Sequence, residues 1–136
     1  MIIVDTCVWS EALRRNRDRD SKTNVELRRL IIEDQAAIIG AVRQELLSGI
    51  RVPALFEQLC GYLRTFPDEQ METEDHEFAA ELHCRCADRG VATSPVDILL
   101  CAVAVRRDWP VFTVDRDFLL YRQVTPLKLH AWDHVQ

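Results

Sequence analysis

Short apolar runs alternate along this chain with longer stretches whose apolar residues recur every three or four positions. The runs at 2–4, 36–40 and 111–114 are brief and end at polar or acidic positions, which is typical of buried parallel strands. A further apolar segment at 127–129 predicts a last short strand. Strands that alternate with helices predict an α/β fold, a three-layer α/β/α sandwich around a central, mainly parallel sheet.

The stretches between these strands carry helix start and stop signals. Thr23 and Glu26 have the spacing of a capping box, Thr73 can cap a later helix, and Ser94-Pro95 is a strong start signal. These signals predict six helices. The first lies near 8–15, the second begins at Thr23, and the third carries Glu45 and stops at Gly49. The fourth runs from Pro53 to Phe66-Pro67, the fifth from Thr73 to Gly90, and the sixth over 96–107. No internal boundary or repeat interrupts this order, so we expect a single domain over 1–136.

Composition supports an ordinary globular protein. The 136 residues are 48% hydrophobic and 29% charged, and no apolar stretch approaches the roughly 20 residues that a membrane span needs. The first residues show no basic leader and no cleavage site, so we expect a cytoplasmic protein without a membrane anchor. Five cysteines, an odd number without paired spacing, favour reduced thiols over a disulfide framework.

Four acids stand where the predicted strands end or the next helices begin. Asp5 and Asp115 directly follow strands, while Glu45 and Asp97 lie in early helical turns. In an open parallel sheet these positions share the edge where ligands bind. Carboxylates gathered there repel one another and raise each other's pKa unless a cation lies between them. Oxygen ligands without histidine or cysteine favour Mg2+ or Mn2+ over zinc.

Each acid also has an ordinary structural explanation. An aspartate after a strand is often a turn or cap residue, Asp97 suits a helix N-terminus, and a glutamate such as Glu45 in an amphipathic helix is usually solvated. Asp97 favours a functional role most, because the helix that follows it is almost wholly apolar and should be buried. A bound metal can activate water for phosphodiester cleavage without a protein nucleophile, which suits a chain with no persuasive Ser-His-Asp or Cys-His set.

Four segments then resemble, in order and spacing, the motifs of PIN domains, and specifically of the VapC toxins of bacterial and archaeal toxin–antitoxin pairs. Residues 3–9 (IVDTCVW) resemble the family's opening strand and hhDTSVW motif, and residues 44–49 (QELLSG) resemble its ELLxG segment. Residues 95–102 (PVDILLCA) resemble the family's DxLIAA helix, and residues 112–118 (FTVDRDF) resemble its TxDxDF ending. Cys7 departs from the family, which often has serine there, and it makes the hydrogen bonding around Asp5 an open question.

The resemblance implies a metal-dependent endoribonuclease that cleaves structured RNA such as tRNA or rRNA with one or two Mg2+ or Mn2+ ions. The metal-binding and catalytic acids would be Asp5, Glu45, Asp97 and Asp115, with Asp117 as an auxiliary acid. Thr6 and Thr113 match hydroxyls that position ligands or water. The resemblance also implies neutralisation by a VapB-like antitoxin, whose C-terminal segment would cover the site, and a homodimer.

The charge balance bears on the substrate in two ways. A net charge of −5 argues against a nucleic-acid binder, although an acidic metal site accounts for part of it. The chain has 15 Arg but only 2 Lys, and four arginines crowd behind the first motif. Arginine suits phosphate contacts, so Arg14 and Arg15 are candidate substrate contacts. The other interpretation is a solvated helix face in an arginine-rich composition.

Two further function classes stay open at this point. One is a catalytically weak PIN-fold interaction module that acts mainly through antitoxin pairing. The other is a phosphoryl-transfer enzyme or receiver domain, which also places an aspartate after its first strand. Against the latter, Asp5 is followed by Thr6-Cys7 rather than by a DxDxT nucleophile motif, and neither Lys22 nor Lys128 is well placed.

Overall fold

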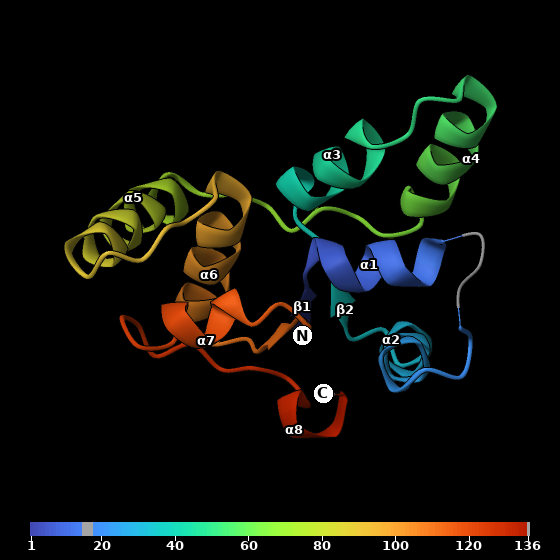
Figure 1. Ribbon diagram of the computed structural model, residues 1–136. Coiled ribbons are helices and arrows are strands. Elements are labelled where there is room, and N and C mark those ends of the chain that lie inside the picture. Colours follow the sequence, from blue (N-terminus) through green and yellow to red (C-terminus); the bar gives the residue numbers. More distant parts are fainter. Residues whose placement is uncertain (15–17, 136) are drawn as a thin grey trace.

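Figure 1 shows the computed structural model, in which residues 1–14 and 18–135 are described. Helices lie on either side of short strands at the centre of the molecule. The elements in chain order are β1 (Ile2–Val4), α1 (Thr6–Leu13), α2 (Lys22–Ile32), β2 (Ala36–Ala37), α3 (Gly40–Ser48), α4 (Pro53–Leu63), α5 (Thr73–Asp88), α6 (Pro95–Arg107), β3 (Val111–Phe112), α7 (Asp117–Tyr121) and α8 (Trp132–Val135).

The sheet is parallel with the order β2-β1-β3, as the three apolar runs predicted. Ile3 of β1 is in register with Ala37 on one side and with Val111 on the other, so the first strand is central. The strands are shorter than predicted: β2 ends at Ala37, Ile38 forms only an isolated parallel bridge with Asp68, and α3 begins at Gly40. The predicted last strand at 127–129 reduces to one parallel bridge between Leu129 and Val111.

Helices cover the sheet as a three-layer sandwich requires, which confirms the predicted fold class. In Figure 1, α5 and α6 lie to the left of the strands, while α1 and α2 lie to the right. Ile3 and Val4 of the central strand are completely buried, as are Leu100 to Ala104 along α6. The buried apolar side chains of the described residues form one connected core around β1 and α6.

Two predicted helix starts were wrong by one or two residues. Ser21, rather than Thr23, caps α2 by accepting a hydrogen bond from Asn24 N, while Thr23 is buried inside the helix. Glu72, rather than Thr73, precedes α5, and it exchanges hydrogen bonds with Asp75 in a capping box. In both places a neighbouring polar side chain reaches the free N–H groups of the first turn better than the predicted threonine does.

The start of α6 is as predicted. Ser94 is the N-cap, Pro95 occupies the first turn, and the Ser94 hydroxyl accepts from Asp97 N at 3.1 Å. Gly90, just beyond α5, has a positive φ of 71° that suits glycine after a helix. None of the helices within 1–14 and 18–135 is long and apolar enough to cross a membrane.

Candidate active site

Asp5 lies at the carboxyl end of the central strand and also caps α1. Its backbone N–H still donates to Phe112 O as part of the sheet, whereas its side chain accepts from Thr6 N at 2.7 Å. The other carboxylate oxygen accepts from Thr113 Oγ1 at 2.8 Å and from the Cys7 thiol at 3.3 Å. Only 3% of Asp5 is exposed, so three donors fix a buried carboxylate in one orientation.

Asp97 lies in the first turn of α6. The Ser94 cap and Pro95 set where the helix begins. Asp97 is half-buried there, and Ile98 and Leu100, which follow it in α6, are buried. Tyr121 of α7 donates its hydroxyl to Asp97 Oδ2 at 3.3 Å. Tyr121 was not among the predicted site residues, although it lies four positions after Asp117 and therefore on the same side of α7.

Thr113 connects the third acid to the first. Its hydroxyl donates to Asp5 and accepts from Asp115 N at 3.0 Å, so a single buried side chain orients both segments. Asp115 is half-buried and its Oδ1 accepts from Asp117 N at 2.9 Å. Asp117 itself is exposed at the start of α7.

The three acids Asp5, Asp97 and Asp115 act on one another electrostatically. Burial, together with the negative charges of Asp5 and Asp115, raises the pKa of Asp97 to about 6. Burial also raises the pKa of Asp5, against the lowering effect of its hydrogen bonds, and Asp115 contributes to the rise. Mutual repulsion among buried acids is the arrangement that a bound cation relieves.

Comparison with known proteins identifies the fold and the family. The family model of the PIN domain matches residues 2–123 of the chain. The chain belongs to the PIN-domain family. PIN domains are typically metal-dependent nucleases, so membership supports a hydrolase that cleaves phosphodiester bonds. No curated protein matches the sequence.

Solved structures share the fold of this PIN domain over almost its whole length. FitAcB from Neisseria gonorrhoeae is 21% identical with a TM-score of 0.76, over 97% of this chain and 99% of that one. VapBC2 from Rickettsia felis, bound to a DNA fragment from its promoter, is 17% identical with a TM-score of 0.76, over 96% and 98%. FitAB bound to an IR36 DNA fragment is 20% identical with a TM-score of 0.71, over 92% of each chain.

The other predicted residues of this PIN domain differ in their exposure. Glu45 is exposed on α3. Thr6 is half-buried, and its hydroxyl has no hydrogen-bond partner among the described residues. Arg14 is exposed just after α1, and Arg15 lies outside the described residues.

The fit of a divalent cation rests on the chemistry of these donors. Oxygen-only ligands suit Mg2+ or Mn2+, and the raised pKa of Asp97 shows an acid whose charge lacks compensation. Within the described residues, no three acidic, histidine or cysteine side chains stand close enough together to hold an ion. The donor set therefore fits the metal in kind, and the carboxylates would have to draw together around it.

Cys7 resolves the departure from the family motif. Its thiol donates to Asp5 and lies 3.5 Å from the Thr113 hydroxyl, in the place where a serine hydroxyl would also reach Asp5. Burial and the charge of Asp5 raise the pKa of the Cys7 thiol to about 12, so the thiol is protonated and acts as a donor at neutral pH. Hydrogen bonding around Asp5 is thus preserved with a weaker donor.

Proposed function

We propose that this PIN domain is the endoribonuclease toxin of a VapBC-type toxin–antitoxin pair, and that it cleaves structured cellular RNA such as tRNA or rRNA. The observation that carries the proposal is the electrostatic coupling of three acids from distant parts of the chain. The charges of Asp5 and Asp115 raise the pKa of Asp97, and the charge of Asp115 also raises the pKa of Asp5. A structural role for these acids alone does not account for such an unfavourable cluster.

The residues of the proposed site fall into metal ligands and the side chains that position them. Asp5, Asp97 and Asp115 would hold Mg2+ or Mn2+, with Glu45 and Asp117 as additional acids that approach the metal or its water. When bound, the ion supplies a Lewis acid that lowers the pKa of a water molecule and neutralises charge on the phosphodiester. Thr113 and Cys7 keep the Asp5 carboxylate in place, and Tyr121 orients Asp97. This second layer of donors limits how far the acids can move.

The partner proposed for this chain is a VapB-like antitoxin. Support comes from the fold shared with the toxin–antitoxin complexes VapBC2 and FitAB. The antitoxin's C-terminal segment would cover the acidic edge and exclude RNA, and the toxin would dimerise. Coexpression of the short reading frame upstream of the gene tests this pairing, because a cognate antitoxin should copurify and stop RNA cleavage.

Cleavage of total RNA by the purified protein tests the proposed activity. With Mn2+ or Mg2+ the wild type should produce discrete fragments, and EDTA should stop the reaction. D5N and D97N should lose at least about a hundredfold in rate, because each removes a proposed ligand. D108N is the matched control: it makes the same charge change in the residue that ends α6, at a φ of 57° that asparagine tolerates.

The second candidate, a catalytically weak module that acts through antitoxin pairing, is favoured by one observation, the exposure of the Glu45 side chain. E45Q discriminates between the two. If Glu45 approaches a bound metal, E45Q should slow cleavage about tenfold or more. Cleavage that persists in both D5N and D97N, or no cleavage of any cellular RNA by the wild type, would favour the weak module.

A further inference from the structure

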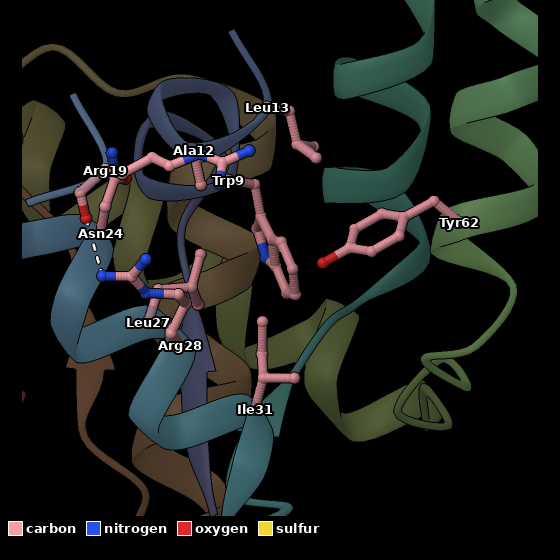
Figure 2. A pocket seen from close by; sticks show the side chains of 9 residues that line it. All are labelled: Trp9, Ala12, Leu13, Arg19, Asn24, Leu27, Arg28, Ile31 and Tyr62. Atoms are coloured by element: carbon pink, nitrogen blue, oxygen red, sulfur yellow. Dashed lines mark hydrogen bonds between the residues drawn. The ribbon is translucent and has the colours of Figure 1, made fainter. Parts of the chain in front are cut away.

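A pocket separate from the acidic site lies against α1. It is about 390 Å3 in volume and is enclosed by α1, α2 and the end of α4 (Figure 2). Leu27 and Ile31 of α2 form its apolar wall, Trp9 and Tyr62 add aromatic rings, and Arg19 and Arg28 lie on its polar side. We call it the Trp9 pocket.

The Trp9 pocket is one helical turn from Asp5. Trp9 N donates to Asp5 O in the first turn of α1, so the two residues are four positions apart on one helix. Four residues correspond to a rise of roughly 6 Å along the helix axis. A ligand that extends beyond the acidic site by about one nucleotide could therefore reach the pocket.

Two buried polar atoms of the pocket have no hydrogen-bond partner among the described residues. They are the indole Nε1 of Trp9, a residue only 1% exposed, and the amide Oδ1 of Asn24, which is 4% exposed. Figure 2 shows the indole between Tyr62 on one side and Leu27 and Arg28 on the other, with its nitrogen directed toward Arg28. An unpaired buried donor and acceptor each cost stability unless a ligand satisfies them.

The cations of the pocket are also uncompensated. Within the described residues, neither Arg19 nor Arg28 forms an ion pair, whereas the next residue along α2, Arg29, pairs with Glu26 and Glu33. Arg28 donates to the backbone oxygen of Arg19 at 2.7 Å, which holds its guanidinium at the pocket (Figure 2). Two guanidinium groups without a carboxylate partner among the described residues, beside an apolar cavity, suit a ligand that is planar in one part and anionic in another.

We propose that the Trp9 pocket binds one nucleotide of the RNA substrate, adjacent to the nucleotide whose bond is cleaved. The base enters the apolar cavity, where its edge accepts from Trp9 Nε1 and donates to Asn24 Oδ1, and its phosphate lies against Arg19 and Arg28. Unpaired bases are read by such edge contacts in single-stranded segments of RNA. This inference rests on the proposed ribonuclease function and locates a substrate subsite for it.

Binding of a fluorescein-labelled ten-nucleotide single-stranded RNA to the full chain in EDTA tests the inference without cleavage. R28Q should weaken binding about fivefold and lower the slope of log K against log salt by about 0.7, the value for one lost phosphate contact. R19Q should behave alike. R29Q, with the same charge change on the same helix, should bind as the wild type does.

A second pair of variants separates the base contact from charge. W9F keeps an aromatic ring but removes the N–H, so it should weaken binding about fivefold with an unchanged salt slope. W109F, two residues beyond the end of α6, is its control, and melting curves establish that both variants fold. If R28Q and R29Q lose affinity equally, or if folded W9F binds RNA as W109F does, the pocket is not a nucleotide subsite.

The outcomes also separate this inference from the proposed activity. Selective loss of binding in R28Q and W9F, together with no cleavage in Mn2+ by the wild type, would support the pocket and contradict the ribonuclease. If the wild type cleaves RNA but R28Q and W9F bind RNA with unchanged affinity, the ribonuclease is supported and the pocket is contradicted. If the same variants lose a protein partner instead of RNA, the pocket is a protein-docking site and the inference is wrong.

Discussion

At the scale of single residues, the Thr113 hydroxyl decides how two of the three acids are held. It donates to Asp5 Oδ2 and accepts from Asp115 N inside the core. T113V, which has nearly the same shape, leaves that N–H unpaired and should lower the free energy of unfolding by about 2 kcal/mol. It should also weaken Mn2+ binding about tenfold.

Urea unfolding and Mn2+ titration of T113V and T113S check this role. The serine variant retains the hydroxyl and should behave like the wild type within about 1 kcal/mol. Equal losses in T113V and T113S would mean that the methyl group, and not the hydrogen bonds, is what the site needs.

Asp97 makes the stability of the metal-free protein depend on pH. Its pKa rises from 3.8 to about 6 on folding, mainly through burial. The folded state therefore favours the neutral acid: the stability that this preference provides is complete below pH 3.8 and is lost as the pH rises through 6. D97N imitates the neutral form, and in EDTA at pH 7.5 it should be more stable than the wild type by about 1 kcal/mol, a value reduced for partial exposure.

Urea unfolding in EDTA at pH 4 and pH 7.5 measures the effect. The advantage of D97N should vanish at pH 4, where the wild-type carboxyl is itself neutral in the folded state, while D108N should show no advantage at either pH. A D97N protein that is less stable than the wild type at pH 7.5 would show that the Asp97 charge is compensated within the fold.

The sequence reveals the identities of the acids better than it reveals their neighbours. Asp5, Asp97 and Asp115 were predicted from motif and position, and the fold brings them within electrostatic reach of one another. The Tyr121 contact with Asp97 could not be predicted, because it depends on how the short α7 packs against α6. Glu45 shows what the sequence leaves undetermined. A motif gives its position in the chain, but the sequence does not show how its exposed side chain is oriented.

At the scale of elements, α6 is held at both ends. Ser94 caps its start, beside Asp97, while Arg106 and Arg107 near its end both donate to Asp75 of α5. The Asp75 side chain is completely buried, and its hydrogen bonds with the two arginines and Glu72 N hold its pKa well below the usual range. This buried ion pair fixes α5 against the helix that carries Asp97.

D75N should lower the free energy of unfolding by about 3 kcal/mol, because it leaves two partly buried arginines without their shared carboxylate. Urea unfolding at pH 7 measures the loss, and D88N, at the exposed end of the same helix, is the control. Since the pKa of Asp75 is lowered by folding, its contribution is complete above its ordinary value and is lost only as the pH falls below it. A loss in D75N no larger than in D88N would contradict the role of this ion pair.

Element types were more predictable than element ends. Apolar runs gave all three strands and apolar periodicity gave α1 to α6, because both patterns reflect burial. The caps of α2 and α5 were misplaced, since several polar residues near each start compete for the same N–H groups. The short α8 was not predicted, because a helix of four residues has no periodicity to detect.

At the scale of the whole molecule, function follows from the parallel sheet. The three strands run in one direction, so Asp5 and Asp115, which follow β1 and β3, reach the same edge, and the N-terminus of α6 brings Asp97 to it. That topology brings Asp97 and Asp115, which follow Asp5 by 92 and 110 positions, into one charged cluster with it. The net negative charge of the protein is in part a property of this edge.

Isothermal titration of Mn2+ into the purified protein at pH 7.5 tests the central claim, that these acids form a cation site. The wild type and D108N should bind Mn2+ with the same affinity, and D97N should bind at least about tenfold more weakly. Equal affinity in D97N and D108N, or no binding by the wild type, would contradict the account.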